Sequence, residues 1–493
     1  MGNARYLILC GTLFLLLWAH SWGDAWLGDF WIYTATVAEV AASPLHPRHP
    51  LFGNDYAFAF LSPYTWILGV ASRLSGSKAF DVLVLQGLAN LALLLWGLHA
   101  FVRAWLRRPQ AAFYALLFIL LLWGPEPWLF SGFLHLRSLA LVLPYPSTFA
   151  FAIALGTLAW FPRLATPGRR AWIVLVLPVM TVLWIVHPVN GLFLAMGLAA
   201  ASLRAPQPRG HWVTLGIVVA ASIGLAFTWP LLSIADLWFG QLDRVHEGND
   251  TMYNSPLPRV APALLGAPWL LARLRRDRRD PLALLTLVLG GLVFFGGLSG
   301  HWTLGRLVSH TVILLQVALA DACASFEEGP GRRFATLRHM LAPALAALLI
   351  SISWSSRVKP TLEEAWRGDT AWLGFLEGRL DHYDIVLTDL ETCWYVPTFN
   401  GKVVAYPMQL PFVPDHAARQ RDVIRFFELD TDPDERCDII QRWSARHVLL
   451  DRSRFPDRQA HLLESLRPLG QVTYSSREYV LLRLGPSCRE TPP

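Results

Sequence analysis

Charged residues are scarce in this sequence. Of its 493 residues, 16% are Asp, Glu, Lys or Arg and 54% are hydrophobic. Soluble globular proteins carry about 25% charged residues, so the composition excludes an ordinary water-soluble enzyme and indicates a membrane protein. Lysine is especially rare: only Lys78, Lys359 and Lys402 occur among the 42 basic residues. This bias towards arginine is typical of a GC-rich bacterial genome.

Cysteine is also sparse, and its spacing excludes two kinds of site. The five cysteines form no CxxC or CxxH pattern, so neither a zinc knuckle nor a redox pair is recognisable. Cys10 and Cys323 lie in apolar runs and fit core positions. If the tail lies outside the cytoplasm, one pair among Cys393, Cys437 and Cys488 can form a disulfide and leave one thiol.

The few charges are unevenly distributed. Residues 1–354 hold 24 Lys and Arg against 15 Asp and Glu, a net charge of +9, whereas residues 355–493 hold 18 against 21, a net charge of −3. The basic excess belongs to loops that flank apolar runs, so it does not indicate a nucleic-acid-binding surface, and we expect no nucleic-acid partner. We expect a transmembrane domain over residues 1–354 and a second domain over residues 355–493.

Apolar runs long enough to cross about 30 Å of hydrocarbon recur through the first part. They lie near residues 6–22, 81–102, 111–124, 140–162, 171–187, 189–204, 212–231, 258–273, 282–298, 306–323 and 337–354. This pattern predicts about eleven membrane spans. A further apolar stretch at residues 57–72 is either a twelfth membrane span or not a span.

The distribution of basic residues decides this question. With the N-terminus in the cytoplasm and residues 57–72 excluded, 17 basic residues lie inside and 7 outside, as the positive-inside rule requires. We therefore interpret residues 57–72 as a re-entrant or interfacial helix. Residues 23–80 then form one long outer loop, and the tail is extracytoplasmic. A signal peptide ending near Ala19-His20-Ser21 is the alternative, but the aromatic residues that follow fit the interfacial belt of a retained anchor.

The tail has the pattern of a small α/β domain. Strands are predicted at residues 383–389, 402–407, 447–451 and 479–485, and helices at residues 361–380, 416–428, 433–445 and 457–466. Three single acids and one acidic run invite a metal interpretation: Asp389, Asp415, Asp451, and the run Asp430, Asp432 and Asp434. Because the run lacks the Gly and the terminal Glu of a calcium loop, we interpret its members as solvated turn residues.

Ionisable residues at the outer end of a membrane bundle are costly to bury and are functional candidates. The first outer loop supplies Asp24, Asp29, Glu39, His46, Arg48, His49 and Asp55. Later outer segments supply Glu126, His135, Arg137, His187, Asp236, Asp243, Arg244, His246, Glu247, Asp250, His301 and Arg306. Arg306 and His310 are four residues apart and share one helical face.

The order of these features resembles the GT-C superfamily of membrane glycosyltransferases, which use polyprenyl-phosphate-linked sugars. The shared features are a cytoplasmic N-terminus, an acid just after the first span and a long first outer loop. That loop, with HPLFGNDYAFAFLSPYTWILGVASRLSG, is similar to the HP-rich loop of protein mannosyltransferases and aminoarabinose transferases. The tail, with TDLETCWYVPTFNGKVVAYP and RWSARHVLLDRS, is similar to the outer domain of oligosaccharyltransferase-type proteins. The absence of a WWDxG motif disfavours asparagine-linked transfer, and no clear Asp-Glu pair of the mannosyltransferases is present.

The resemblance implies a polytopic α-helical, GT-C-like membrane protein of a bacterial inner membrane, with a C-terminal extracytoplasmic α/β domain. It also implies a reaction in which an acceptor hydroxyl attacks the sugar C1, a carboxylate removes the proton, and cations stabilise the departing phosphate. Asp29 matches the family's first-loop acid by position, and Asp24 is the runner-up. The alternative for both is a helix-ending or interfacial aspartate without a catalytic role.

The remaining candidates concern the donor phosphate, the acceptor and a metal. Arg306 suits a lipid phosphate because a guanidinium binds phosphate oxygens bidentately, although a snorkelling interfacial arginine is an equal alternative. Arg244 and Arg137 are further phosphate candidates. The candidates for contact with the acceptor or with a divalent metal are His46, His49, Asp55, His187, His246 and Glu247. No other cofactor is expected.

Each of these assignments leaves a structural alternative open. His46 and His49 flank Pro and Arg in HPRHP and also fit a loop-structuring role, and His187 before Pro188 also fits a helix end. The segment around Arg244 fits either a lid over the donor or a solvated connection. The expected partners are the lipid bilayer, a polyprenyl-phosphate sugar donor and a glycan, lipid or protein acceptor.

Three other functions compete with this interpretation. A transporter of a lipid-linked intermediate would place ion pairs near mid-membrane in broken helices with repeat symmetry, and the sequence has few mid-span charges and no two-fold repeat. An O-antigen ligase or polymerase would place its large outer loop late, whereas here the large loop comes first. A non-catalytic assembly subunit would bury its first-loop acid away from any cavity.

Overall fold

The computed structural model describes residues 2–23, 26, 28–164, 170–241, 248–329, 335–365, 373–454 and 458–485. The chain divides into two compact units. The helical unit comprises Met1–Trp26, Val84–Ala235 and His246–Gly368. The second unit comprises Leu27–Leu83, Asp236–Val245 and Asp369–Pro493. The long first loop therefore groups with the tail.

Six helical runs of the described chain are long and apolar enough to cross a membrane. They lie in α1 (Gly2–Ser21), α4 (Ala79–Leu106), α10 (Arg209–Ala226), α15 (Pro281–Ser299), η5 (Trp302–Arg306) with α16 (Leu307–Glu327), and α17 (Ala335–Ser353) with η7 (Trp354–Val358) and α18 (Lys359–Ala365). Shorter apolar helices lie in α5 (Ala111–Leu121), α7 (Pro146–Leu164), η1 (Arg170–Leu175) with α8 (Val176–Val186), and α9 (Pro188–Leu203). A polytopic helical membrane protein is therefore the correct class.

The expected span at residues 258–273 is not one continuous α-helix. It is divided into α13 (Pro256–Val260), η4 (Ala261–Gly266) and α14 (Ala267–Arg276). Each piece carries a proline at its first or second position, where the missing N–H is tolerated. A Cβ on Gly266 would lie 2.0 Å from the carbonyl oxygen of Leu315, so only glycine allows this approach to α16. The exact count of eleven spans stays a prediction.

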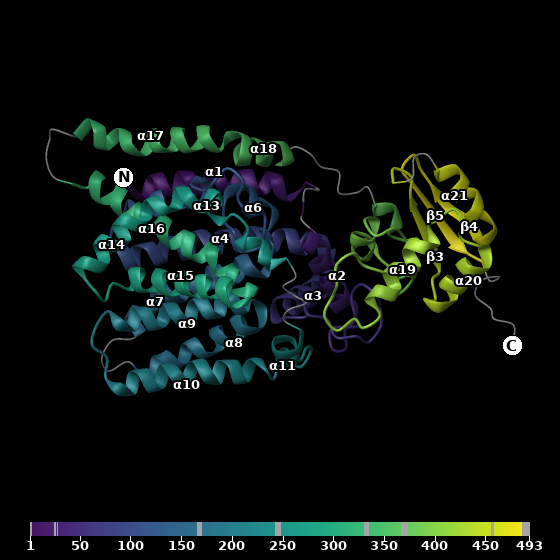
Figure 1. The fold of residues 1–493 in the computed structure, drawn as a ribbon, viewed down its shortest axis with the longest axis horizontal. Helices are drawn as coiled ribbons and strands as arrows, with labels where there is room; N and C mark the ends of the chain where they lie inside the picture. Colours follow the sequence, from purple (N-terminus) through teal and green to yellow (C-terminus); the bar gives the residue numbers. More distant parts are fainter. Residues whose placement is uncertain are drawn as a thin grey trace. The chain divides into compact units, whose positions relative to one another are not determined.

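Ion pairs tie the ends of several helices together at one end of the helical unit. Arg5 Nη1 lies 2.5 Å from Glu327 Oε1, and the Tyr114 hydroxyl donates to Glu327 Oε2 at 2.8 Å. Neighbouring pairs are Arg108–Asp321, Arg108–Glu328, Arg273–Asp321 and Arg273–Asp280. Arg5 begins α1 and Glu327 ends α16, and the helices of this unit run alongside one another (Figure 1). The C-terminus of α1 and the start of α16 therefore share the opposite end, here termed the distal end.

Short segments connect these helices at the distal end. They are α6 (Leu136–Leu141), η3 (Asn249–Tyr253) and η5. In the sequence, α10 is followed by α11 (Ile234–Asp236) and by η2 (Leu237–Gln241), most of which belongs to the second unit. Trp123, Trp128, Phe133, Met252 and Val312 are buried in one cluster that packs η3 and the loop before α6 against α16. This packing holds irregular backbone in place at the end of the bundle.

The second unit begins with two packed helices, α2 (Gly28–Ala42) and α3 (Pro63–Ser75). Ser62 and Thr65 form a reciprocal capping box at the start of α3, and Gly76 ends it with a φ of 68°. Its 13 residues span only about 20 Å at 1.5 Å per residue. This short helix fits the exclusion of residues 57–72 from the membrane spans.

The tail forms a mixed five-stranded sheet in the order β2-β1-β3-β5-β4. Its strands are β1 (Ile385–Leu387), β2 (Lys402–Val403), β3 (His447–Asp451), β4 (Gly470–Ser475) and β5 (Tyr479–Leu484). β1 is parallel to β2 and β3, whereas β5 is antiparallel to β3 and β4. The helices are α19 (His416–Phe426), α20 (Pro433–Arg442) and α21 (Gln459–Leu466), with 3-10 turns η8 (Gly374–Leu376), η9 (Thr392–Trp394), η10 (Val396–Phe399) and η11 (Arg467–Leu469).

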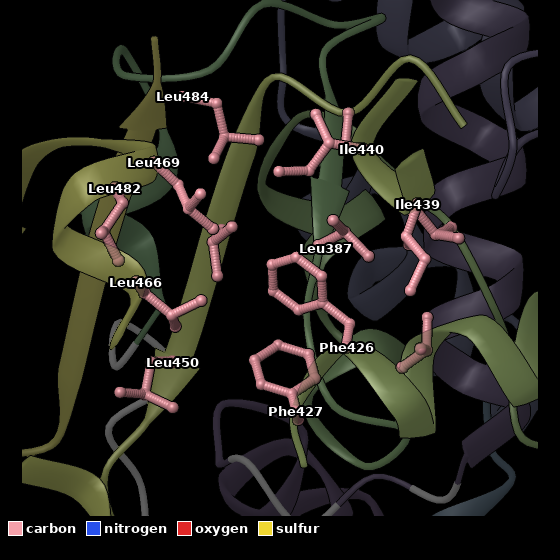
Figure 2. Close-up of a cluster of buried hydrophobic side chains, with 14 of the residues drawn as sticks. Leu387, Phe426, Phe427, Ile439, Ile440, Leu450, Leu466, Leu469, Leu482 and Leu484 are labelled. Atoms are coloured by element: carbon pink, nitrogen blue, oxygen red, sulfur yellow. The ribbon is translucent and has the colours of Figure 1, made fainter. Parts of the chain in front are cut away.

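Helix and strand side chains of the tail close one hydrophobic core (Figure 2). Leu387 and Leu450 on the strands meet Phe426 of α19, Ile440 of α20 and Leu466 of α21. Each of these five side chains is at most 1% exposed. Burial of a Leu, Ile or Phe side chain contributes about 1.5–3 kcal/mol, so this core is sufficient to explain why the tail forms a compact α/β arrangement.

The predicted elements of the tail are confirmed with three corrections. β3 has the predicted bounds, and the bounds of β1, β5, α19, α20 and α21 differ from the predicted ones by at most three residues. The strand predicted at residues 402–407 is limited to β2, Lys402–Val403. The predicted helix at 361–380 is wrong for residues 374–380, where a single 3-10 turn and Gly378 with a φ of 79° replace it. β4 was not predicted, because its sequence GQVTYS is mostly polar and exposed.

The acidic residues of the tail have turn and capping roles. Asp432 caps α20 by accepting from the backbone N–H of Asp434 at 2.8 Å, and Asp389 accepts from two backbone N–H groups in the turn before η9. These contacts support the interpretation of Asp432 and Asp389 as turn and capping residues. Cys437 is disulfide-bonded, whereas Cys393 is a free, buried thiol.

Candidate functional site

Arg306 is a cation of the distal end. It is the last residue of η5, directly before α16. Its Nε donates to Asn249 Oδ1 at 2.8 Å, and its Nη1 donates to the Ser131 hydroxyl at 3.2 Å and carbonyl at 3.3 Å. The guanidinium lies over the Phe130 ring, 5.2 Å from its centroid. Two separate segments, η3 and the loop before α6, therefore fix the plane of this half-buried group.

A buried polar chain lies one helical turn further along α16. His310 Nε2 lies 2.8 Å from Asn190 Oδ1, and Asn190 Nδ2 lies 3.0 Å from His187 Nδ1. Because the amide oxygen only accepts and the amide nitrogen only donates, His310 carries its proton on Nε2 and His187 accepts on Nδ1. His310 therefore lies one turn from Arg306 on α16, as predicted. Its contact with Asn190 joins α16 to α9.

His187 itself separates two helices. It ends α8 with a φ of −160°, and Pro188 begins α9 directly after it. The helix-ending role is therefore present, and the contact with Asn190 adds a polar role. Asn190 also donates to the carbonyl oxygen of Ser147 at 3.2 Å.

Arg137 lies at the start of α6 and belongs to an ion pair. Its Nη2 donates to Glu364 Oε1 at 3.0 Å, and His20 Nε2 is 3.7 Å from Glu364 Oε2. An arginine already paired with a carboxylate attracts a phosphate less strongly than one held by neutral groups. The ion pair with Glu364 therefore weakens Arg137 as a phosphate candidate.

The second unit holds the first-loop candidates. Asp29 is half-buried in the first turn of α2. His46 is exposed, and the Asp55 side chain is 95% exposed with only a long 3.9 Å contact to Arg48. Asp29 is therefore less solvated than Asp55.

His49 is a structural residue of the loop. It is fully buried, stacks on Phe52 with ring centroids 4.6 Å apart, and its Nδ1 accepts from the backbone N–H of Leu51. Burial, and then the positive charges of Lys402 and Arg419, hold the pKa of His49 well below its ordinary value. A neutral, enclosed imidazole supports the loop-structuring interpretation.

Several candidates from the sequence lie outside the described residues: Asp24, Arg244, His246 and Glu247. Among the described residues, no three His, Cys, Asp or Glu side chains converge as metal ligands. His187 belongs to the helical unit, whereas His46, His49 and Asp55 belong to the second unit. The described residues therefore offer no metal site from which a reaction step can be derived.

A buried ion pair that sequence analysis did not predict joins the first loop to the tail. Lys402 Nζ lies 2.6 Å from Glu39 Oε2, and both side chains are at most 1% exposed. His382 Nε2 contacts the same oxygen at 2.9 Å, while the Tyr383 hydroxyl donates to Oε1 at 3.1 Å. Although burial raises the pKa of Glu39, the hydrogen bond from His382 and the charge of Lys402 lower it to about 2. The pairing of residues 363 positions apart leaves no local signal in the sequence.

Replacing Glu39 by Gln should detach the first loop from the tail. The change leaves the Lys402 ammonium buried without its counter-charge, which costs about 3–5 kcal/mol. Hydrogen exchange of the full chain in nanodiscs should show faster exchange at residues 46–56 and 400–406. The control is Glu377→Gln, which removes an exposed loop-to-tail pair of the same 2.6 Å length with Lys78 and should cost about 0–1 kcal/mol. Equal effects of the two variants would contradict this role of Glu39.

Acid should weaken the same contact. The folded-state pKa of Glu39 is lowered from 4.5 to about 2, so its stabilisation is complete above the unfolded value and is lost as the pH falls through the folded value. In the wild-type protein, exchange at residues 46–56 should therefore rise between pH 4.5 and about 2.

Comparison with known proteins identifies the fold. No protein-family description and no curated protein sequence matches the chain. The solved apo structure of the Archaeoglobus fulgidus oligosaccharyltransferase matches 95% of this chain and 73% of its own chain, with 10% identity and a TM-score of 0.53. The complex of the archaeal oligosaccharyltransferase AglB with an inhibitory peptide and a dolichol-phosphate matches 96% and 73%, with 11% identity and a TM-score of 0.51.

A second kind of glycosyltransferase matches equally well. The structure of the arabinofuranosyltransferase AftD from Mycobacteria matches 98% of this chain, with 15% identity and a TM-score of 0.58. This chain spans 40% of the length of that one. Both kinds of enzyme are GT-C glycosyltransferases, and each likeness extends over both units of this chain. The predicted resemblance is confirmed: this chain has the fold of the GT-C membrane glycosyltransferases.

Proposed function

We propose that this protein is an integral-membrane glycosyltransferase that moves a sugar from a polyprenyl-phosphate donor to an acceptor hydroxyl on the outer side of the membrane. The observation that carries the proposal is the whole-chain likeness to two different GT-C glycosyltransferases. One of the similar structures was solved with a dolichol-phosphate, which is a lipid phosphate of the proposed class.

The donor phosphate is assigned to Arg306. Asn249 and Ser131 orient its guanidinium, so less conformational entropy is lost when a phosphate binds. A fixed cation at the distal end also stabilises charge that develops on the leaving phosphate, because it needs no reorganisation during the reaction. Asn249 and Ser131 are thus positioning residues for this step.

The proposed base is Asp29, with Asp24 as the alternative. The carboxylate accepts the proton of the acceptor hydroxyl while that oxygen forms a bond to the sugar C1. The bond between C1 and the phosphate oxygen breaks, and its electron pair leaves on the polyprenyl phosphate. The products are the glycosylated acceptor and the free lipid phosphate, and the proton is then released from the aspartate.

The outer location rests on two supporting observations. Basic residues are asymmetrically distributed over the expected loops, 17 to 7, and Cys437 is disulfide-bonded, as is common outside the cytoplasm. We place the protein in a bacterial inner membrane with a cytoplasmic N-terminus.

Reporter fusions test this orientation. Alkaline phosphatase fused to the C-terminus of the full chain should be active, and a cytoplasm-dependent fluorescent reporter should be dark at the same place. Inserted beside Arg278, in the arginine-rich segment after α14, the two reporters should give the opposite result. Strong fluorescence from the C-terminal fusion would reverse the assignment, including the side of the membrane on which Asp29 lies.

Transfer by the purified protein tests the activity. The protein in nanodiscs should release undecaprenyl phosphate from radiolabelled undecaprenyl-phospho-glucose, -mannose or -arabinose when a membrane glycan extract is added. The label should appear in the glycan, lipid or protein fraction of that extract. Failure with all three donors, in protein that binds undecaprenyl phosphate, would favour a non-catalytic assembly subunit or a transporter.

A further inference from the structure

Three polar side chains from three helices meet at the distal end of the helical unit, where α18 packs against α1 and α6 (Figure 1). They are His20 in the last turn of α1, Arg137 at the start of α6 and Glu364 in α18. Arg137 Nη2 donates to Glu364 Oε1 at 3.0 Å. This cluster is built from residues that the proposed mechanism does not use.

The hydrogen bonding of the cluster is incomplete. His20 is 1% exposed, and neither of its ring nitrogens has a hydrogen-bond partner among the described residues. Glu364 Oε2 and Arg137 Nε are also buried and lack partners there. The 3.7 Å between His20 Nε2 and Glu364 Oε2 is too long for a hydrogen bond. Because buried polar atoms are nearly always satisfied, two donors and two acceptors in one place indicate a missing polar partner.

One side of the cluster is partly exposed. The side chains of Arg137 and Glu364 are 33% and 16% exposed, whereas that of His20 is 1% exposed. The Trp26 ring stands edge-on to the His20 ring, with centroids 5.9 Å apart. His20 and Trp26 thus form the closed side. A ligand reaches the buried Arg137 Nε and Glu364 Oε2 from the other side when these two partly exposed side chains rotate outward.

The charges decide which kind of group fits. Arg137 and Glu364 carry opposite charges and are paired, so the cluster offers no net attraction to an anion. A hydroxyl group can donate to Glu364 Oε2 and accept from Arg137 Nε or from a ring N–H of His20, which a phosphate cannot do. The complementary ligand is therefore neutral and carries more than one hydroxyl group.

We propose that His20, Arg137 and Glu364 form a binding site for sugar hydroxyl groups, separate from the phosphate site at Arg306. This inference rests on the proposed function, because that function supplies a sugar on the donor and, for a glycan acceptor, a second one. Arg137 then contacts the sugar, not the phosphate. The site determines which sugar is accepted by requiring hydroxyl groups that reach all three side chains.

Binding to the full-length protein in nanodiscs tests the proposal. The variants are Glu364→Gln, which removes the carboxylate acceptor, and His20→Phe, which keeps a ring but removes both nitrogens. The matched control is Glu363→Gln, the neighbouring residue, which is 49% exposed and pairs only loosely with Lys359 at 3.7 Å. The probes are radiolabelled undecaprenyl phosphate, its glucose, mannose and arabinose derivatives, and the corresponding methyl glycosides.

Glu364→Gln should bind sugar-free undecaprenyl phosphate as the wild type does and bind one sugar-bearing probe roughly tenfold more weakly, since a hydrogen bond to a charged group is lost. A loss confined to a lipid-linked probe assigns the site to the donor sugar, and a loss confined to a methyl glycoside assigns it to the acceptor. Glu363→Gln should match the wild type throughout. His20→Gln, which retains an amide donor and acceptor, should recover part of the binding that His20→Phe loses. Comparison of these two His20 variants tests the proposal if Glu364→Gln does not fold.

Two results would overturn the proposal in different ways. If the wild type transfers sugar but neither Glu364→Gln nor His20→Phe changes binding of any sugar-bearing probe, the cluster only locks helices together and the proposed function stands. If the wild type binds neither undecaprenyl phosphate nor any sugar-bearing probe, both the proposed function and the sugar site are wrong.

Discussion

Asp29→Asn should lower sugar transfer by roughly 10²-fold or more, which is the usual contribution of a general base. Asparagine keeps the size of the side chain and its capacity for hydrogen bonds, but it cannot accept the hydroxyl proton. Asp29 lies in the first turn of α2. The rate of label transfer from the lipid-linked donor, at saturating donor, measures the effect.

Asp81→Asn is the matched control for this variant. Asp81 is also a first-turn aspartate, at the start of α4, and it takes no part in the proposed chemistry. Its replacement removes the same charge and the same favourable contact with a helix N-terminus and should leave transfer within about twofold. Unchanged transfer by Asp29→Asn at normal protein levels would exclude Asp29 as the base and favour Asp24 or Asp55.

Arg306→Ala should weaken binding of undecaprenyl phosphate by roughly 10-fold to 100-fold, because charge-assisted hydrogen bonds contribute about 1.5–3 kcal/mol. Arg306→Lys should lie between the wild type and the alanine variant, because lysine keeps the charge and loses the two-pronged geometry. Equilibrium binding of the radiolabelled lipid to protein in nanodiscs measures both effects.

The control for Arg306 is Arg259→Ala. Arg259 also lies over an aromatic ring, 5.1 Å from the centroid of Trp128, and donates to the carbonyl oxygen of Glu126 at 2.9 Å. It therefore controls for loss of a cation–π contact and a carbonyl bond in the same unit. Equal binding by Arg306→Ala and the wild type would assign the phosphate to another cation and leave Arg306 with a structural role.

Local signals predicted much of the fold and the individual elements of the site. HVLLD at residues 447–451 predicts a buried strand because its central Val-Leu-Leu run is suited to a sheet interior, and β3 has those bounds. The four-residue spacing of Arg306 and His310 follows from helical geometry alone. β4 escaped prediction because an exposed edge strand has no apolar alternation to reveal it.

Long-range partners could not be predicted in the same way. Nothing near Arg306 in the sequence indicates that Asn249 and Ser131, 57 and 175 residues away, orient its guanidinium. Likewise, the sequence shows Glu39 only as one acid on an amphipathic stretch, and its ion pair with Lys402 is visible only in the structure. Such contacts depend on tertiary packing, which a single sequence does not specify residue by residue. For the same reason, the cluster of His20, Arg137 and Glu364 emerged only with the packing of α1, α6 and α18.

A structure of the protein with bound undecaprenyl-phospho-sugar tests the central claim most directly, because it locates the phosphate, the sugar and the base together. The account predicts phosphate oxygens within about 3 Å of the Arg306 guanidinium nitrogens. A phosphate bound to Arg137 or Arg244, with Arg306 directed into lipid headgroups, would contradict the account even if the protein proved to be a transferase.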